Sequence, residues 1–146
     1  MPTALATADR LKSSFARTVM TRRSNKTVAL ARRPQISNRV KASIFISFHF
    51  NSAGSHNLAY GYEVFKYHKN ADRFASILDK NFSDLNLFNR GIAFGNYQVL
   101  RDNKRPAVLI EMGFMDSDHD FPYIKSPRYH RQIAADINKS LIEYFR

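Results

Sequence analysis

The sequence predicts an α/β domain built on a mostly parallel, twisted central sheet flanked by helices. Two observations predict this class. Segments with strand character alternate along the chain with segments of helical periodicity, and two of the strand-like segments are continuous apolar runs, as in strands buried on both faces. The chain has 146 residues and 44% of them are hydrophobic, including 12 Phe and 7 Tyr. We therefore expect a single domain over residues 1–146.

Helices are predicted where apolar residues recur at a spacing of three and four. This spacing is found at 4–15, where Phe15 is the last inward residue, at 71–85 and at 126–145. A further helix is predicted over 28–41 with Leu30 and Val40 facing inward. Pro34 lies inside that segment, so it should kink the helix or delay its start.

Strands are predicted where short β-branched or aromatic runs are bounded by turn residues. These segments are 17–21, 43–49, 61–67, 97–100 and 107–111, of which 43–49 and 107–111 are the apolar, buried ones.

Two of these strands end in a residue that could carry chemistry, His49 and Glu111. In open α/β sheets, functional residues gather at the carboxyl ends of strands. His49 is a candidate zinc ligand, although its spacing alone favours a core histidine bonded to backbone. Glu111 is a candidate general base, or else the partner of a cation such as Arg90 or Arg101.

The remaining titratable residues carry weaker signals. Glu63 lies in the alternating strand 61–67, where it faces either solvent, which we favour, or the same crevice as Glu111. The other histidines lie in polar segments or on a helix face, which is typical of ordinary surface histidines: His56, His68, His119 and His130.

Composition narrows the classes of function. The chain has no Cys, which excludes disulfides, thiolate metal sites and a cysteine nucleophile. Residues 1–41 carry 10 Lys/Arg and one Asp, whereas residues 42–146 carry 13 Lys/Arg and 11 Asp/Glu. The basic segment suits a solvated surface, but also nucleic acid, anionic lipid or an anionic wall polymer. No run is long enough to span a membrane, and the first residues show no signal peptide.

Four ordered motifs resemble the zinc-dependent N-acetylmuramoyl-L-alanine amidases of bacterial and phage cell-wall lysis. They are F-I-S-F-H-F-N-S (45–52), N-R-G-I-A (89–93), Q-V-L-R (98–101) and P-A-V-L-I-E-M-G-F-M (106–115). Upstream, M-T-R (20–22), Arg33, Asn38 and Ala42 match a weaker pattern of the family. The resemblance begins near residue 9 and extends to the C-terminus.

The resemblance implies a peptidoglycan hydrolase of the cell envelope or the exterior, such as an autolysin, and no nucleic-acid partner. It implies one catalytic Zn²⁺ and cleavage of the amide between N-acetylmuramic acid and L-alanine. His49 matches the family's second histidine ligand and Glu111 its catalytic glutamate. Asn51 and Arg90 match motif positions near the crevice, without a chemical role assigned to them.

The sequence departs from the family pattern at its start. The family's first strand, its first histidine ligand and its glutamate ligand have no counterpart before His49. We therefore expect an incomplete metal site and a gap in the sheet. Three interpretations follow: an N-terminally truncated amidase, a degenerate relative that binds wall material or regulates a paralogue without catalysis, or a site rebuilt from His56 or His68. A basic nucleic-acid-binding module is the alternative outside the family.

Overall fold

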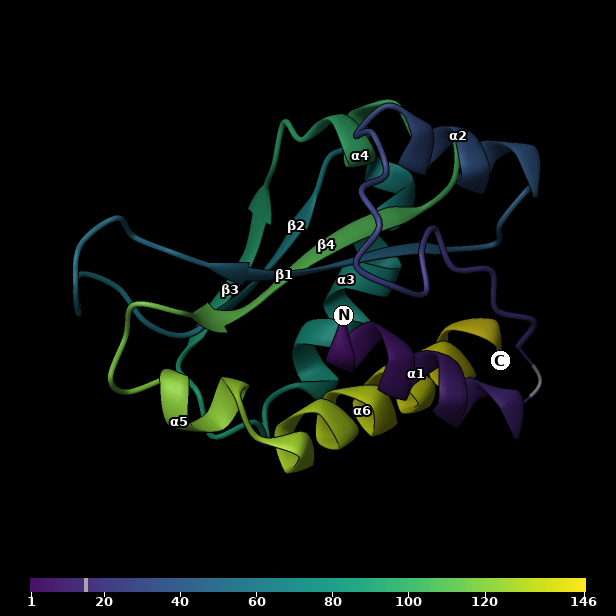
Figure 1. Cartoon of the computed structure of the whole chain (residues 1–146). Helices are drawn as coiled ribbons and strands as arrows, with labels where there is room; N and C mark the ends of the chain where they lie inside the picture. Colours follow the sequence, from purple (N-terminus) through teal and green to yellow (C-terminus); the bar gives the residue numbers. More distant parts are fainter. Residues whose placement is uncertain (15) are drawn as a thin grey trace.

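The structure is a computed structural model that describes residues 1–14 and 16–146 (Figure 1). In chain order its elements are α1 (Pro2–Lys12), α2 (Arg32–Arg39), β1 (Phe45–Asn51), β2 (Tyr62–Lys66), the 3₁₀ turn η1 (Lys69–Ala71), α3 (Asp72–Asn81), β3 (Asn89–Phe94), α4 (Gln98–Arg101), β4 (Ala107–Phe114), α5 (Phe121–Ile124) and α6 (Pro127–Phe145).

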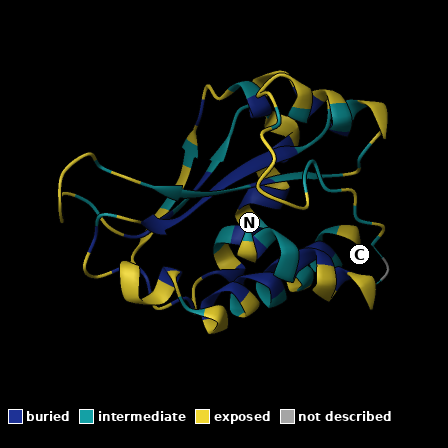
Figure 2. Cartoon of the chain, in the orientation of Figure 1, coloured by how far each residue is buried: buried dark blue, intermediate teal, exposed yellow. Residues whose placement is uncertain are grey.

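The strands form one sheet in the order β1-β4-β2-β3. β1 pairs with β4 and β2 pairs with β3 in parallel, whereas β2 and β4 run antiparallel. The sheet is therefore mostly parallel, as predicted. β4 lies inside it and all eight of its residues are buried, so it appears dark blue along its length in Figure 2.

The two faces of the sheet are covered unequally. Val108, Ile110 and Met112 of β4 point into the main core, which α1, α3 and α6 complete. Ala107 and Leu109 point to the other face, where they pack on Val99 and Leu100 near the start of β4. In Figure 1, α2 and α4 lie together at that end of the sheet. Side chains alternate along a strand, so Glu111 shares the face of Ala107 and Leu109.

Several predicted elements are confirmed. The helices expected at 71–85 and 126–145 are α3 and α6, and Ser126 caps α6 by accepting a bond from the Arg128 amide. The strands at 61–67 and 107–111 are β2 and β4, although β4 continues past Gly113 to Phe114. α1 corresponds to the helix expected at 4–15, and Phe15 lies outside the described residues.

Predictions in the basic segment were partly wrong. Residues 17–20 have no regular structure and residue 21 is a bend, so the strand expected at 17–21 is absent; Val19 is exposed there. The helix expected at 28–41 is limited to α2, as the delay at Pro34 suggested. Leu30 and Val40 point outward, with 59% and 43% of their surface exposed, while Pro34 and Ser37 are the buried residues of α2.

Two further segments differ from expectation. Residues 97–100 form the start of α4, because the Leu100 and Arg101 amides both donate to the Tyr97 carbonyl oxygen at 2.9 Å. β3 was not predicted; its residues are exposed or half-buried and include Gly91 at a positive φ of 82°. The strand expected at 43–49 is β1, but only Ser47 in it is buried, because β1 lies at an edge of the sheet.

Candidate functional site

Three ionisable side chains lie in a row across neighbouring strands. His49 of β1 is the register partner of Glu111 of β4, and Glu63 of β2 is its partner on the other side. Directly paired residues project from the same face of a sheet, with Cβ atoms about 5 Å apart. The fold therefore brings together the two residues singled out by the sequence and adds Glu63 to them.

Glu111 is a buried carboxylic acid with an unsatisfied oxygen. Its side chain is on the sheet face that α1, α3 and α6 leave uncovered, yet only 9% of the residue is exposed. Among the described residues, its Oε2 atom has no hydrogen-bond partner. Burial, and then the charge of Glu63, raise the pKa of Glu111 to about 7. A carboxyl group with a pKa near neutrality can both take and return a proton.

Glu63 lies beside Glu111 on the same face of the sheet and is mostly buried, contrary to the prediction that it faces solvent. Its side chain is 17% exposed, and Arg90 Nε lies 3.5 Å from its Oε2 atom. Arg90 also donates to the Tyr60 carbonyl oxygen at 3.3 Å. The sequence could not predict this arrangement, since the alternation of β2 leaves open which face is solvated, and only the pairing of β2 with β4 places Glu63 beside Glu111.

The ion pair considered for Glu111 is not found in the described part of the chain. Arg90 pairs with Glu63 instead, and Arg101 with Asp102 at 3.2 Å. A structural ion pair therefore does not explain the burial of Glu111.

His49 is held in a form that suits a metal ligand. Its Nε2 atom lies 3.0 Å from the Ser47 hydroxyl, on the same strand and face. Burial lowers the pKa of His49, as do the charges of Arg33 and Arg22. A lowered pKa favours the neutral imidazole, which is the form that binds metals.

The remaining histidines lie elsewhere. His56 contacts Asp118 at 3.0 Å and His68 contacts the Arg101 carbonyl oxygen at 2.9 Å, both at exposed positions. His119 lies beside Asp120, half exposed. His130 is buried, contrary to the surface position predicted for it, because α1 covers α6 there and Thr3 contacts its ring at 2.8 Å.

A catalytic zinc site normally has three protein ligands. Within residues 1–14 and 16–146, no group of three or more His, Cys, Asp and Glu side chains is placed to hold a metal ion. The residues present therefore do not fit a complete catalytic zinc site. They do fit part of one, because the lowered pKa of His49 favours the metal-binding form of its ring and the buried Oε2 of Glu111 lacks a partner within the described residues.

The loops after β1 and β4 and the loop before β2 are joined by two aspartates that the sequence analysis did not single out, Asp116 and Asp120. Asp116 Oδ2 accepts bonds from the Ser52 hydroxyl and the amides of Ala53 and Gly54. Asp120 is fully buried, and its Oδ2 accepts from the amides of Gly61 at 2.7 Å and Phe114 at 2.9 Å. These bonds hold the three loops together at this end of the sheet.

Comparison with known proteins agrees with this geometry. Residues 1–143 match the family described as N-acetylmuramoyl-L-alanine amidase. The chain is 37% identical over 124 residues to the probable cell wall amidase LytH of Staphylococcus aureus, a match that covers 84% of this chain and 40% of LytH. The chain spans 24% to 40% of the length of the first curated relatives it matches.

Solved amidase structures share the fold. The catalytic domain of CwlV from Bacillus (Paenibacillus) polymyxa var. colistinus superposes with a TM-score of 0.92 at 29% identity, covering 98% of this chain and 80% of that one. AmiC2 of Nostoc punctiforme superposes with a TM-score of 0.93 at 29% identity, covering 99% and 81%. The chain belongs to the N-acetylmuramoyl-L-alanine amidase family of cell wall amidases.

Proposed function

We propose that this protein hydrolyses the amide bond between N-acetylmuramic acid and L-alanine in peptidoglycan, with Glu111 as the residue that carries the proton. The observation that carries this proposal is the pairing of His49 with Glu111, whose buried carboxyl has an unsatisfied oxygen and a pKa near 7. Family membership supplies the substrate class. The site of action follows from the substrate and is the cell envelope or the exterior. Within the described residues, no helix has the length and apolar character of a membrane span.

The reaction requires a proton to move twice. Water adds to the lactyl carbonyl carbon, and Glu111 takes one of its protons as the new C–O bond forms. The C–N bond then breaks, and Glu111 returns the proton to the departing L-alanine nitrogen. The products are a free lactyl carboxylate and a free amine. A pKa near 7 suits both transfers, because the carboxyl is then poised between its two protonation states at neutral pH.

The pair of Glu63 and Arg90 supports this role. Glu63 adds negative charge beside Glu111 and so helps to keep the pKa of Glu111 high. Arg90 lies against Glu63, with its Nε atom 3.5 Å from Oε2, and so holds that carboxylate in place. We propose that both are positioning residues.

We propose His49 as one zinc ligand. Because the described residues do not complete a three-ligand set, we derive no step of the reaction from the metal. The proposal is tested by zinc bound per chain after dialysis in micromolar Zn²⁺, for the wild type, His49→Ala and the control His68→Ala. We expect His49→Ala alone to lower the bound zinc, and equal zinc in all three proteins would contradict the assignment.

The activity is tested on purified peptidoglycan with Zn²⁺ present, by measuring the release of new amino-terminal L-alanine. Glu111→Gln keeps the size of the side chain but removes the proton carrier, so we expect at least about a hundredfold slower release. Glu143→Gln is the matched control, because Glu143 lies on α6 and contacts Lys80 and Asn81 away from the site. Equal rates in the wild type and Glu111→Gln would exclude the proposed role.

A further inference from the structure

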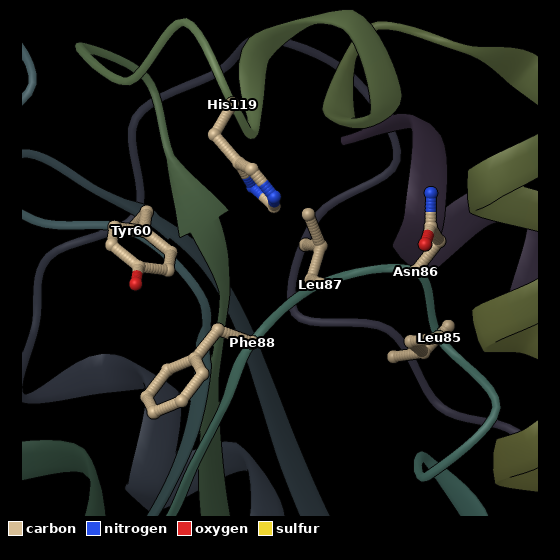
Figure 3. A pocket seen from close by; sticks show the side chains of 6 residues that line it. All are labelled: Tyr60, Leu85, Asn86, Leu87, Phe88 and His119. Carbon is tan, nitrogen blue, oxygen red and sulfur yellow. The ribbon is translucent and has the colours of Figure 1, made fainter.

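A recess lies near one end of the sheet, lined by residues other than His49, Glu111 and Glu63. It has a volume of about 300 Å³ and is open to solvent (Figure 3). Its lining combines aromatic, aliphatic and polar side chains: Tyr60, Leu85, Asn86, Leu87, Phe88 and His119. The proposed hydrolysis makes no use of these residues.

The aromatic side chains of this recess are exposed despite their size. Tyr60 is 47% exposed and Phe88 is 55% exposed, and their ring centroids lie 5.5 Å apart in an edge-to-face arrangement. Tyr60 also faces the His119 ring, with centroids 5.2 Å apart. Leu85 and Leu87 belong to the core and form an apolar floor. Exposed aromatic groups beside an apolar floor leave surface that a ligand can cover.

The histidine of the recess is oriented by a buried carboxylate. His119 Nδ1 lies 2.9 Å from Asp120 Oδ1, while the other Asp120 oxygen accepts the amides of Gly61 and Phe114. With Nδ1 donating to Asp120, Nε2 is left as the acceptor for a ligand. Figure 3 shows the His119 ring directed into the space between Tyr60 and Leu87. At the rim, Asn86 donates its amide to the Tyr123 hydroxyl, which leaves the Asn86 carbonyl oxygen as a further acceptor.

Arg90 connects this recess with the row of His49, Glu111 and Glu63. It donates to the carbonyl oxygen of Tyr60 and pairs with Glu63, the neighbour of Glu111. Tyr60 precedes Glu63 by three residues, which places their Cα atoms at most about 10 Å apart. A polymer with its scissile bond at Glu111 can therefore reach the recess with a neighbouring unit.

We propose that the recess formed by Tyr60, Phe88 and His119 binds a sugar ring of the glycan strand next to the hydrolysed bond. This inference rests on the proposed function and adds a subsite to it. A sugar ring has an apolar face of C–H groups and an edge of hydroxyl groups. The recess offers the matching pair of surfaces, with Tyr60 and Phe88 for the ring face and His119 and Asn86 for the hydroxyl groups.

The lining argues against a peptide carboxylate or ammonium as the ligand. The lining residues include no Lys or Arg to pair with a carboxylate and no Asp or Glu to pair with an ammonium group. The Asp120 carboxylate behind His119 is fully buried and already bonded to two backbone amides and His119. An uncharged, amphipathic ligand is therefore favoured over the charged stem peptide.

The subsite is tested by titrating the ¹⁵N-labelled full chain with a linear trimer of β-1,4-linked N-acetylglucosamine and following amide chemical shifts. We expect shifts at residues 60, 86–88 and 119. Phe88→Ala and Tyr60→Ala should each weaken binding at least about fivefold, the effect of losing one aromatic contact. Phe94→Ala is the matched control, since Phe94 is 68% exposed on β3 but outside the recess. This variant should bind the trimer with the affinity of the wild type.

Because both substituted rings are exposed, the variants should keep the wild-type spectrum away from the recess, which the same titration checks. Absence of shifts at the recess, or equal affinity of Phe88→Ala and Phe94→Ala, would overturn the subsite. Shifts there caused by the dipeptide L-Ala-D-isoglutamine and not by the sugar trimer would also overturn it. Binding is measured without turnover, so the two proposals can fail separately. If the chain binds the trimer but releases no L-alanine, the subsite is supported and the proposed hydrolysis is contradicted.

Discussion

At the scale of single residues, the unsatisfied carboxyl of Glu111 should reduce the stability of the protein at high pH. A buried charge without a partner is costly, which is why burial and Glu63 raise its pKa from 4.5 to about 7. Between these two values the folded state binds more protons than the unfolded state. This contribution therefore favours folding below pH 4.5 and is lost as the pH rises through 7.

Glu111→Gln removes this dependence. Relative to the variant, the free energy of unfolding of the wild type should fall by up to about 3 kcal/mol between pH 4.5 and pH 7. Urea unfolding of both proteins at several pH values measures the difference, in which the other titrating groups cancel. A difference that is flat with pH, or that grows in favour of the wild type, would mean that Glu111 is ionised and well solvated in the folded protein.

The Asp120 carboxylate stabilises the fold, unlike that of Glu111, because hydrogen bonds compensate for its burial. Asp120→Ala leaves the amides of Gly61 and Phe114 unsatisfied and frees His119, so we expect a loss of roughly 3 kcal/mol or more in the free energy of unfolding. The control is Asp118→Ala, since Asp118 bonds Asn57 at an exposed position and should matter far less. If both variants lose the same stability, Asp120 does not hold the strand ends together as described.

At the scale of elements, the entry into β2 depends on Gly61. Its φ of 103° is unfavourable for other residues, and a Cβ atom there would collide with the Phe88 carbonyl group. Gly54 also has a positive φ, 78°, but has open space around it. We expect Gly54→Ala to cost about 1 kcal/mol and Gly61→Ala about 3 kcal/mol, measured by chemical unfolding. Equal costs would show that the close approach of Phe88 relaxes easily.

Local patterns predicted the elements that make their own core contacts. α3 and α6 show clear helical periodicity, and β4 is a continuous apolar run. The failures have a common cause, because their structure is set by neighbours distant in sequence. Residues 97–100 look like a strand but form α4, whose Val99 and Leu100 pack on β4. β3 is a strand only because it pairs with β2.

The same limit applies to the site. The sequence predicted that His49 and Glu111 would lie together, because both follow strands whose ends meet at one edge of a sheet. It did not predict Glu63 beside them, since that requires the antiparallel pairing of β2 with β4. The recess at Tyr60 and His119 was also unpredictable, because it is assembled from three loops.

At the scale of the whole molecule, the fold places the proposed proton carrier Glu111, the proposed zinc ligand His49 and the recess proposed to bind a sugar ring near one end of the sheet. α1, α3 and α6 cover the opposite face and support β4 from behind. We propose that this arrangement hydrolyses one particular bond, between the lactyl group of N-acetylmuramic acid and L-alanine.

The most direct test is mass spectrometry of the products formed from purified peptidoglycan in ¹⁸O-labelled water with Zn²⁺ present. Hydrolysis at the proposed bond places one ¹⁸O atom in the lactyl carboxylate of the glycan and releases unlabelled peptides that begin with L-alanine. We predict this pattern for the wild type and its loss in Glu111→Gln. Label within the released peptides, or glycan strands shortened by cleavage between sugars, would show cleavage of a different bond and would contradict the proposed hydrolysis.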